Sequence, residues 1–241
     1  MNRSPPTQPL NFYLTQPHDC AYLHDREATT LFADPKAVID STLYGRLLER
    51  GFRRSGDYFY RPHCSACSDC LSVRLAVNDF TANRSQRRNW RANSDLTVTP
   101  HAACYNEQHF ELYRRYINTC HAGGGMDNPD ANSYRQFLTC SSIDSVFYEF
   151  HDNHRLVAVA VIDCLPRGLS SVYTFFDPDL KQRGLGVYAI LWSINETRRR
   201  NLPWLYLGYW IEACDRMRYK SRYQPLQAYH DRGWRNFSAH S

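Results

Sequence analysis

No stretch of this sequence stays apolar for the roughly 18 residues that a membrane-spanning helix requires. The first thirty residues also have no basic start followed by a continuous apolar core, so no signal peptide is predicted. We therefore expect no membrane partner and no export. Nine cysteines, an odd number, are typical of a chain in a reducing compartment, and the expected location is the cytoplasm.

The chain also lacks a strong net charge. Its 29 Lys and Arg residues against 24 Asp and Glu residues give +5, which by itself defines no partner. The distribution is more informative, because arginine gathers at 84–91, 198–200 and 216–222, with aromatic residues between. Guanidinium groups suit phosphate and aromatic rings stack on bases. Together the clusters favour a nucleic-acid partner, although any one of them fits a solvated helix face equally well.

No internal repeat or low-complexity segment divides the chain, and 241 residues fit one large domain or two small ones. Residues 1–95 read as a mostly irregular, cysteine-containing region with a strand at 70–77 and a basic helix start or loop at 84–91. Residues 96–241 have longer elements, with a glycine-rich connection at 121–125. Helices are expected at 106–120, 133–140 (capped by Asn132), 185–200 and 212–223, and strands at 145–150, 156–165, 170–176 and 202–210.

The order of these elements predicts the fold class. Three strands in succession make an antiparallel meander, and the strand–helix–strand step that follows adds a right-handed parallel crossover. The expected class is therefore α+β, a mixed sheet with flanking helices plus a smaller N-terminal cysteine-containing region.

Three cysteines lie at C-x-x-C-x-x-C spacing, as Cys64, Cys67 and Cys70. Two-residue gaps let a tight turn direct neighbouring thiolates at one centre, as in zinc and iron–sulfur sites. Cys20 would complete a four-ligand set, and His63 is a competing fourth ligand. Three buried, reduced thiols are the alternative, since free cysteine is often buried.

A second pattern lies at 173–186, where a predicted strand ends and a predicted helix begins. Gly184 and Gly186 open that helix, and glycines there let free backbone amides approach a phosphate. A tight turn explains the glycines equally well. Combined with the strand order, this half resembles the N-acetyltransferase (GNAT) fold, whose corresponding loop binds the pyrophosphate of acetyl-CoA.

Several blocks taken together resemble a narrower family. They are Gly51-Phe52-Arg53-Arg54-Ser55-Gly56, the cysteine run, Arg84-Ser85-Gln86-Arg87-Arg88, Tyr173 to Pro178, Tyr206 to Ile211, and Met217 to Lys220. In this order they resemble the aminoacyl-tRNA–protein transferases, and most closely the bacterial leucyl-transferring branch, from about Cys20 to Tyr223. The resemblance implies a cytosolic enzyme that moves leucine from leucyl-tRNA onto proteins with N-terminal Asp or Glu, marking them for degradation through the N-degron pathway.

The resemblance also implies that no cofactor is required for the chemistry. Eukaryotic arginyl-transferring members carry a second cysteine soon after the first, whereas this chain has Leu23 there. The ligand set therefore differs from that of the eukaryotic members. A structural zinc ion or iron–sulfur cluster is expected at Cys20, Cys64, Cys67 and Cys70.

The implied reaction is attack by an α-amine on the ester that joins an amino acid to tRNA. Asp177 is expected to steer the amine and Tyr173 to supply a hydroxyl near it. Asp177 also suits a turn before Pro178, and Asp179 is the neighbouring alternative.

Substrate contacts are expected from cations and aromatic residues. A carboxylate on the acceptor needs a cation, preferably a guanidinium. The residues expected to bind substrate are Arg53, Arg54, Arg61, Arg74, Tyr209 and Tyr219. The residues expected to bind tRNA are Arg87, Arg88, Gly184, Gly186, Lys220 and Arg222. Taken singly, each arginine also fits an ordinary surface charge.

Three readings compete with leucyl transfer. Arginyl-tRNA is the alternative donor for the same acceptors. A CoA-dependent N-acyltransferase would use the GNAT-like half but leaves the arginine clusters and cysteines unexplained. A non-catalytic zinc-containing nucleic-acid-binding module explains those features but gives residues 177–186 no purpose.

Overall fold

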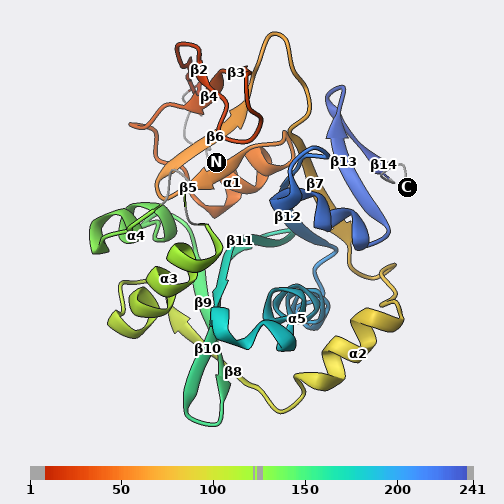
Figure 1. Cartoon of the computed structure of the whole chain (residues 1–241). Helices are drawn as coiled ribbons and strands as arrows, with labels where there is room; N and C mark the ends of the chain where they lie inside the picture. Colours follow the sequence, from red (N-terminus) through yellow and green to blue (C-terminus); the bar gives the residue numbers. More distant parts are fainter. Residues whose placement is uncertain (1–8, 122, 124–126, 238–241) are drawn as a thin grey trace, which may run out of the picture.

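The computed structural model describes residues 9–121, 123 and 127–237. Its centre is an eight-stranded mixed sheet in the order β14–β13–β7–β12–β11–β10–β9–β8 (Figure 1). The strands are β7 (Leu71–Ala76), β8 (Thr97–Ala102), β9 (Ser145–Asp152), β10 (Arg155–Leu165), β11 (Gly168–Phe176), β12 (Trp204–Trp210), β13 (Leu226–His230) and β14 (Gly233–Phe237). All neighbouring pairs are antiparallel except β11 and β12.

Helices cover both faces of this sheet because its central strands, such as β10, carry apolar side chains on both faces. Side chains alternate between the faces of a strand. Val159 and Val161 pack in one core with α3 (Glu107–Cys120) and α4 (Ala131–Leu138), whereas Ala160 and Ile162 pack in another with α5 (Leu185–Arg199). Figure 1 shows α3 and α4 on one side, α5 on the other, and α2 (Arg84–Ala92) beyond α5.

The β11–α5–β12 unit forms the predicted parallel pair, but the pairing is short. Only residues 168–170 of β11 pair with residues 204–206 of β12. Beyond that point β12 keeps its partner β7, with a register shift next to Gly208, whose φ is +81°. We call the region between residues 171–176 of β11 and 207–210 of β12 the β11–β12 split.

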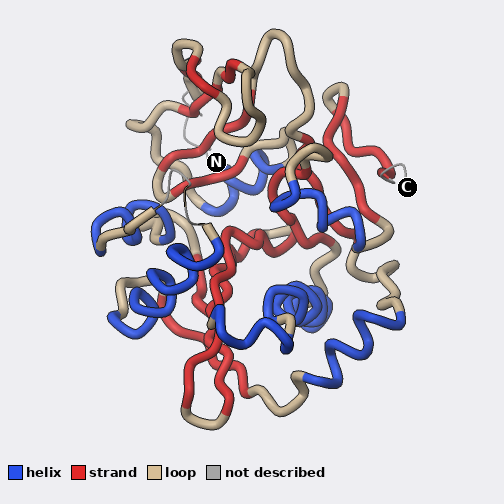
Figure 2. The backbone as a smooth tube through the Cα atoms, in the orientation of Figure 1, coloured by secondary structure: helices blue, strands red, loops and turns tan. Residues whose placement is uncertain are grey.

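Residues 9–62 form a smaller four-stranded sheet in the order β1–β4–β6–β5 and a two-stranded ribbon, visible as strands in Figure 2. The elements are β1 (Phe12–Leu14), β2 (His18–Asp19), β3 (Glu27–Ala28), β4 (Thr30–Ala33), α1 (Ser41–Leu48), β5 (Arg53–Ser55) and β6 (Tyr58–Pro62). Phe52 and Phe59 of this part share a core with Leu165 and Tyr206 of the central sheet. The N-terminal region also supplies β7, which lies between β12 and β13.

The predicted strands at 70–77, 145–150, 156–165, 170–176 and 202–210 are confirmed, as are the helices at 106–120 and 185–200. The sheet is mixed and flanked by helices, as expected. The segment at 84–91 is a helix, and a capping box between Asn83 and Gln86 stabilises its N-terminus.

Two helix predictions were wrong in detail. The helix expected at 133–140 under Asn132 begins at Ala131 because Asp130 is its cap, with Oδ1 accepting from the Ser133 amide at 2.7 Å. The helix expected at 212–223 is a short α6 (Asp215–Arg218) followed by a 3₁₀ turn, η2 (Tyr219–Arg222), in which the Lys220 ammonium donates to the Tyr209 carbonyl of β12.

The strands between residues 12 and 62 were missed because each is at most five residues long, too short for a clear period. The β8 strand and the β13–β14 hairpin were missed as well. Most of the glycine-rich connection predicted at 121–125 lies outside the described residues.

Candidate active site

Tyr173 projects from β11 at the β11–β12 split and lies among aromatic rings. Its ring centroid is 5.1 Å from that of Phe137 and 6.1 Å from that of Tyr113. The hydroxyl lies 3.4 Å from Nε2 of His121. Burial, reinforced by Tyr116, raises the pKa of Tyr173 well above its ordinary value, so the hydroxyl keeps its proton at neutral pH and can donate a hydrogen bond.

His121 follows the last residue of α3 and was not predicted as a site residue. Burial, and secondly the charge of Arg216, lowers its pKa, so the imidazole is neutral near pH 7. A neutral imidazole has a free nitrogen lone pair that can accept a proton. A single histidine after a helix has no spacing that sequence reasoning could have used.

Asp177, the predicted amine-steering residue, lies at the end of β11 with its side chain 1% exposed. Oδ1 accepts from Arg115 of α3 at 2.8 Å, and Oδ2 accepts from Arg155 at the start of β10. Oδ1 also accepts from the Asp179 amide at 3.1 Å. Its carboxylate is thus held by two guanidinium groups and a backbone amide. These bonds connect the end of β11 with α3 and β10 beside the split. Arg115 also donates to Asp179 at 2.7 Å.

Two buried cations approach Gly208 on the other side of the split. A Cβ built on Gly208 would lie 3.7 Å from Nζ of Lys220 and 4.0 Å from Nε of Arg53. Lys220 is 6% exposed and Arg53 is 6% exposed, whereas Gly208 is partly exposed. Both cations therefore gather just beneath a backbone position that solvent can reach.

Neither cation has a carboxylate partner among residues 9–121, 123 and 127–237. Arg53 donates to the carbonyls of Phe52 (2.8 Å), Val73 (3.3 Å) and Gly208 (3.3 Å), and its buried Nε has no hydrogen-bond partner in the part of the chain that the structure describes. Burial, and secondly the charge of Arg53, lowers the pKa of Lys220 to about 7. A buried charge is normally paired, so this pair can bind an anion.

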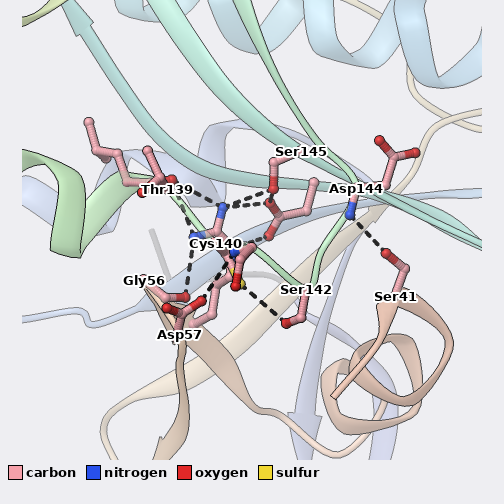
Figure 3. A network of polar contacts seen from close by, with 12 residues as sticks. Ser41, Gly56, Asp57, Thr139, Cys140, Ser142, Asp144 and Ser145 are labelled. Atoms are coloured by element: carbon pink, nitrogen blue, oxygen red, sulfur yellow. Dashed lines mark hydrogen bonds and ion pairs between the residues drawn. The ribbon is translucent and has the colours of Figure 1, made fainter. Parts of the chain in front are cut away.

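The other three predicted acceptor arginines are engaged elsewhere. Arg54 makes a two-bond ion pair with Asp163 (2.8 and 2.7 Å), and both side chains are 0% exposed. Figure 3 shows the surrounding network, in which Ser145 also donates to Asp163 at 2.6 Å and Ser41 accepts from the Asp144 amide at 3.0 Å. This network joins α1, β5 and the α4–β9 connection, so Arg54 binds protein groups on every side.

Arg74 and Arg61 also have protein partners. Arg74 donates to both carboxylate oxygens of Glu49 at 2.8 Å and lies between the rings of Trp204 (3.7 Å) and Trp234 (4.3 Å). Arg61 donates to the Arg50 carbonyl at 3.3 Å. Of the four arginines, Arg53 is the one that is buried without a carboxylate partner among the described residues.

The predicted tyrosines differ in their surroundings. Tyr209 is buried, and its hydroxyl lies within hydrogen-bonding distance of the carbonyls of Gly51 (3.1 Å) and Tyr60 (3.2 Å). Tyr219 is 36% exposed, next to Lys220. Tyr209 therefore anchors β12, whereas Tyr219 is partly exposed, with its ring centroid 5.7 Å from Nζ of Lys220.

The predicted tRNA-contacting residues lie in three different surroundings. Arg87, Arg88 and Arg222 are exposed, as phosphate contacts require, whereas Lys220 belongs to the buried pair. The two predicted glycines allow close packing. A Cβ on Gly184 would lie 2.7 Å from the side-chain amide nitrogen of Asn89, and one on Gly186 would lie 3.1 Å from the Phe176 ring.

The four cysteines of the predicted metal site lie near one another and are partly buried. Burial raises the pKa of Cys70 to about 12, with further contributions from Cys20, Cys64 and Cys67. Within the described part of the chain, however, no three or more His, Cys, Asp or Glu side chains are arranged to hold a metal ion. The thiols are gathered, but their placement is not that of a ligand set.

None of the helices in the described residues has the length and apolar character needed to span a membrane.

Comparisons with known proteins connect this geometry to a family. Residues 18–88 match the family model "Arginine-tRNA-protein transferase, N terminus", and residues 108–230 match "Arginine-tRNA-protein transferase, C terminus". The chain therefore belongs to the aminoacyl-tRNA–protein transferase family that these two models describe. It is an aminoacyltransferase by this membership.

Its similar relatives include proteins named aspartate/glutamate leucyltransferase. The one from Pseudomonas aeruginosa is 49% identical over 93% of this chain and 96% of its own length, and the one from Marinobacter nauticus is 48% identical over 95% and 97%. A solved structure of L-PGS from Bacillus licheniformis aligns with a TM-score of 0.45 and 8% identity, over 59% of this chain and 47% of that chain. That likeness is too low to bear on fold or function.

Proposed function

We propose that the protein transfers leucine from leucyl-tRNA to the α-amine of proteins that begin with Asp or Glu. Relatives named for this activity match nearly the whole chain at about half identity. The structural observation that carries the proposal is the buried Arg53–Lys220 pair, because an acidic acceptor supplies the anion that the pair lacks. Marking for degradation and a cytoplasmic location follow as parts of the same proposal.

In the proposed complex, the acceptor's side-chain carboxylate lies at Gly208 between Arg53 and Lys220. The partly exposed Gly208 leaves room there because it has no side chain. Buried cations favour a carboxylate strongly, since each hydrogen bond is charge-assisted. A neutral N-terminal residue would leave both cations unpaired, which explains how one site selects Asp and Glu together.

The reaction is aminolysis of an ester. The amine nitrogen bonds to the leucyl carbonyl carbon, the bond from that carbon to the ribose oxygen breaks, and one proton passes from the amine to the ribose oxygen. An α-amine with a pKa of about 7.7–8.0 is already partly unprotonated, so positioning contributes most. The Tyr173 hydroxyl can donate to the developing oxyanion, and His121 can accept the amine's proton.

Asp177 acts in this scheme as a positioning residue. We expect Asp177→Asn to lower the free energy of unfolding by about 1–3 kcal/mol, because a neutral amide loses charge-assisted bonds to Arg115 and Arg155. Transfer should fall too, because Arg115 lies on the helix that ends beside His121. Denaturant unfolding and leucine transfer, measured together, check this.

The matched control is Asp179→Asn. The Asp179 carboxylate is exposed and pairs with Arg115, and the hydrogen bond from its backbone amide to Asp177 survives the substitution, so both measurements should stay near wild type. An Asp177→Asn protein with wild-type stability and no transfer would instead indicate direct contact of Asp177 with the amine.

We also infer the finer fold assignment and the division of the chain. The early end of β11–β12 pairing and the crossover through α5 support a GNAT-like transfer domain within 96–241. Residues 1–95 would then recognise acceptor and tRNA, consistent with the position of Arg53 in β5 and of the basic helix α2.

A structural zinc ion or iron–sulfur cluster at Cys20, Cys64, Cys67 and Cys70 remains part of the proposal, with no role in the chemistry. Four thiols that lie near one another support it, and their side chains would have to rearrange to coordinate the ion. We expect Cys67→Ala to lower bound metal and the melting temperature, with the exposed Cys104→Ala as control. Metal content and melting temperature equal to wild type in Cys67→Ala would contradict this assignment.

A transfer assay tests the function as a whole. Peptides beginning with Asp, Glu or Ala are offered leucyl-tRNA, arginyl-tRNA or acetyl-CoA. Leucine on the Asp and Glu peptides alone is the expected result. Arginine transfer would keep the class and change the donor, whereas acetyl transfer would overturn the tRNA-dependent reaction.

A further inference from the structure

A cavity of about 330 Å³ lies between α2 and α5, away from the β11–β12 split. Apolar side chains, among them Phe80, Trp90, Leu191 and Ile194, make up part of its wall. Trp90 is half-buried and is fixed from behind by Tyr188, with ring centroids 5.2 Å apart. The cavity therefore offers a rigid aromatic surface of a size suited to one small planar group.

Arginines complete the wall of this cavity. Arg198 donates to the carbonyls of Val77 (2.6 Å) and Phe80 (2.5 Å), and Arg87 donates to that of Ala82 (2.5 Å). Arg91 lines the cavity as well, and it is exposed. The described residues that line the cavity include no carboxylate, and α2 has no acidic residue from Arg84 to Ala92. Two guanidinium groups, those of Arg87 and Arg198, are thus held by carbonyl groups and not by carboxylates of the cavity wall.

We propose that this cavity binds one unpaired nucleotide of the tRNA, with the base against Trp90 and its phosphate on Arg87 and Arg91. Bases stack on aromatic rings in single-stranded recognition, and arginine contacts the adjoining phosphate. An acidic protein surface would use the arginines but not the apolar wall. The proposal rests on the proposed function, because it takes tRNA as the substrate.

The cavity lies further along α5 than the β11–β12 split. Gly184 is the N-cap of α5, and the cavity-lining residues of α5, between 191 and 198, follow on the same helix. At 1.5 Å per residue, they lie about 10–20 Å further along the helix axis. The cavity and the transfer site are therefore separate, because Tyr173 packs in the core formed with α3 and α4 on the other face of the sheet.

The test measures binding of uncharged leucine tRNA and of polyglutamate to the whole protein at several salt concentrations. Arg91→Ala should weaken tRNA binding about 5- to 10-fold and reduce the slope of log K against log salt by about 0.7–0.9, one phosphate contact. Trp90→Leu, which keeps an apolar side chain, should weaken tRNA binding about 10-fold and leave polyglutamate binding unchanged. Arg114→Ala, on the exposed face of α3, is the control.

Two outcomes would overturn the proposal. One is tRNA binding by Trp90→Leu and Arg91→Ala at the wild-type level. The other is an equal loss of tRNA and polyglutamate binding in both variants, which would indicate a general anion surface. Wild-type protein that binds tRNA in this way but transfers no leucine would refute the proposed function and leave the nucleotide site intact.

Discussion

Lys220→Met is expected to reduce transfer to Asp and Glu peptides by about two to three orders of magnitude, because a buried charge partner of the substrate is removed. Methionine keeps the length and apolar stem of lysine while removing the ammonium group. The loss should appear in kcat/KM for the acceptor peptide, with tRNA binding unchanged. Steady-state transfer with varied peptide, and tRNA binding by filter retention, check both parts.

The same substitution should leave the protein at least as stable as wild type at pH 7. Burial lowers the pKa of Lys220 to about 7 in the folded chain, against an ordinary value of 10.5. Between these values the unfolded chain binds a proton that the folded chain lacks, so unfolding free energy rises with pH from 7 to 10.5. Below pH 7 the full cost of burying the charge applies, and methionine removes that cost.

The pH dependence distinguishes this explanation from ordinary packing. Wild-type unfolding free energy should rise between pH 7 and pH 9, and Lys220→Met should lack that part of the slope. Lys36→Met, at an exposed lysine, should retain the wild-type slope and activity. A Lys220→Met protein that transfers normally, or that loses several kcal/mol at pH 7, would refute the assignment of Lys220 as the anion-binding cation.

Asp163→Ala should produce a large loss of stability, about 3–5 kcal/mol, because it leaves the buried Arg54 guanidinium without its carboxylate partner. Both partners are 0% exposed and joined by two short hydrogen bonds. For a chain of this size, 1 kcal/mol corresponds to about 2–4 °C, so a fall of roughly 6–20 °C in melting temperature is expected. Calorimetry measures it directly.

Removing both charges tests the cause of that loss. Arg54→Met combined with Asp163→Leu should recover a large part of the stability, because no uncompensated charge remains. The exposed pair Arg114 and Glu111 provides the comparison, and Glu111→Ala should cost at most about 1 kcal/mol. An Asp163→Ala protein that melts within 2 °C or so of wild type would show that Arg54 finds other partners.

Neighbouring residues show where sequence reasoning reached its limit. Arg53 and Arg54 are adjacent in β5, and both were expected to bind the acceptor. Side chains alternate along a strand, so Arg53 points towards Gly208 and Arg54 points towards Asp163. Alternation was predictable, but the group that each side would meet was not, because Asp163 and Gly208 lie more than a hundred residues away in the sequence.

The sequence by itself determined the elements with clear local periods: α3, α5, β7 and the β9–β11 meander, with the parallel step to β12. It also determined the family, because several motifs in one order are specific together. Short strands before residue 63 and the partners of Asp177 came from the tertiary structure alone. Periodicity is a local property of the chain, whereas the pairing of a buried charge depends on which distant segments pack together. The tertiary structure therefore decided which of the predicted cations are neutralised by the protein, and within the described residues it left Arg53 and Lys220 without a carboxylate partner.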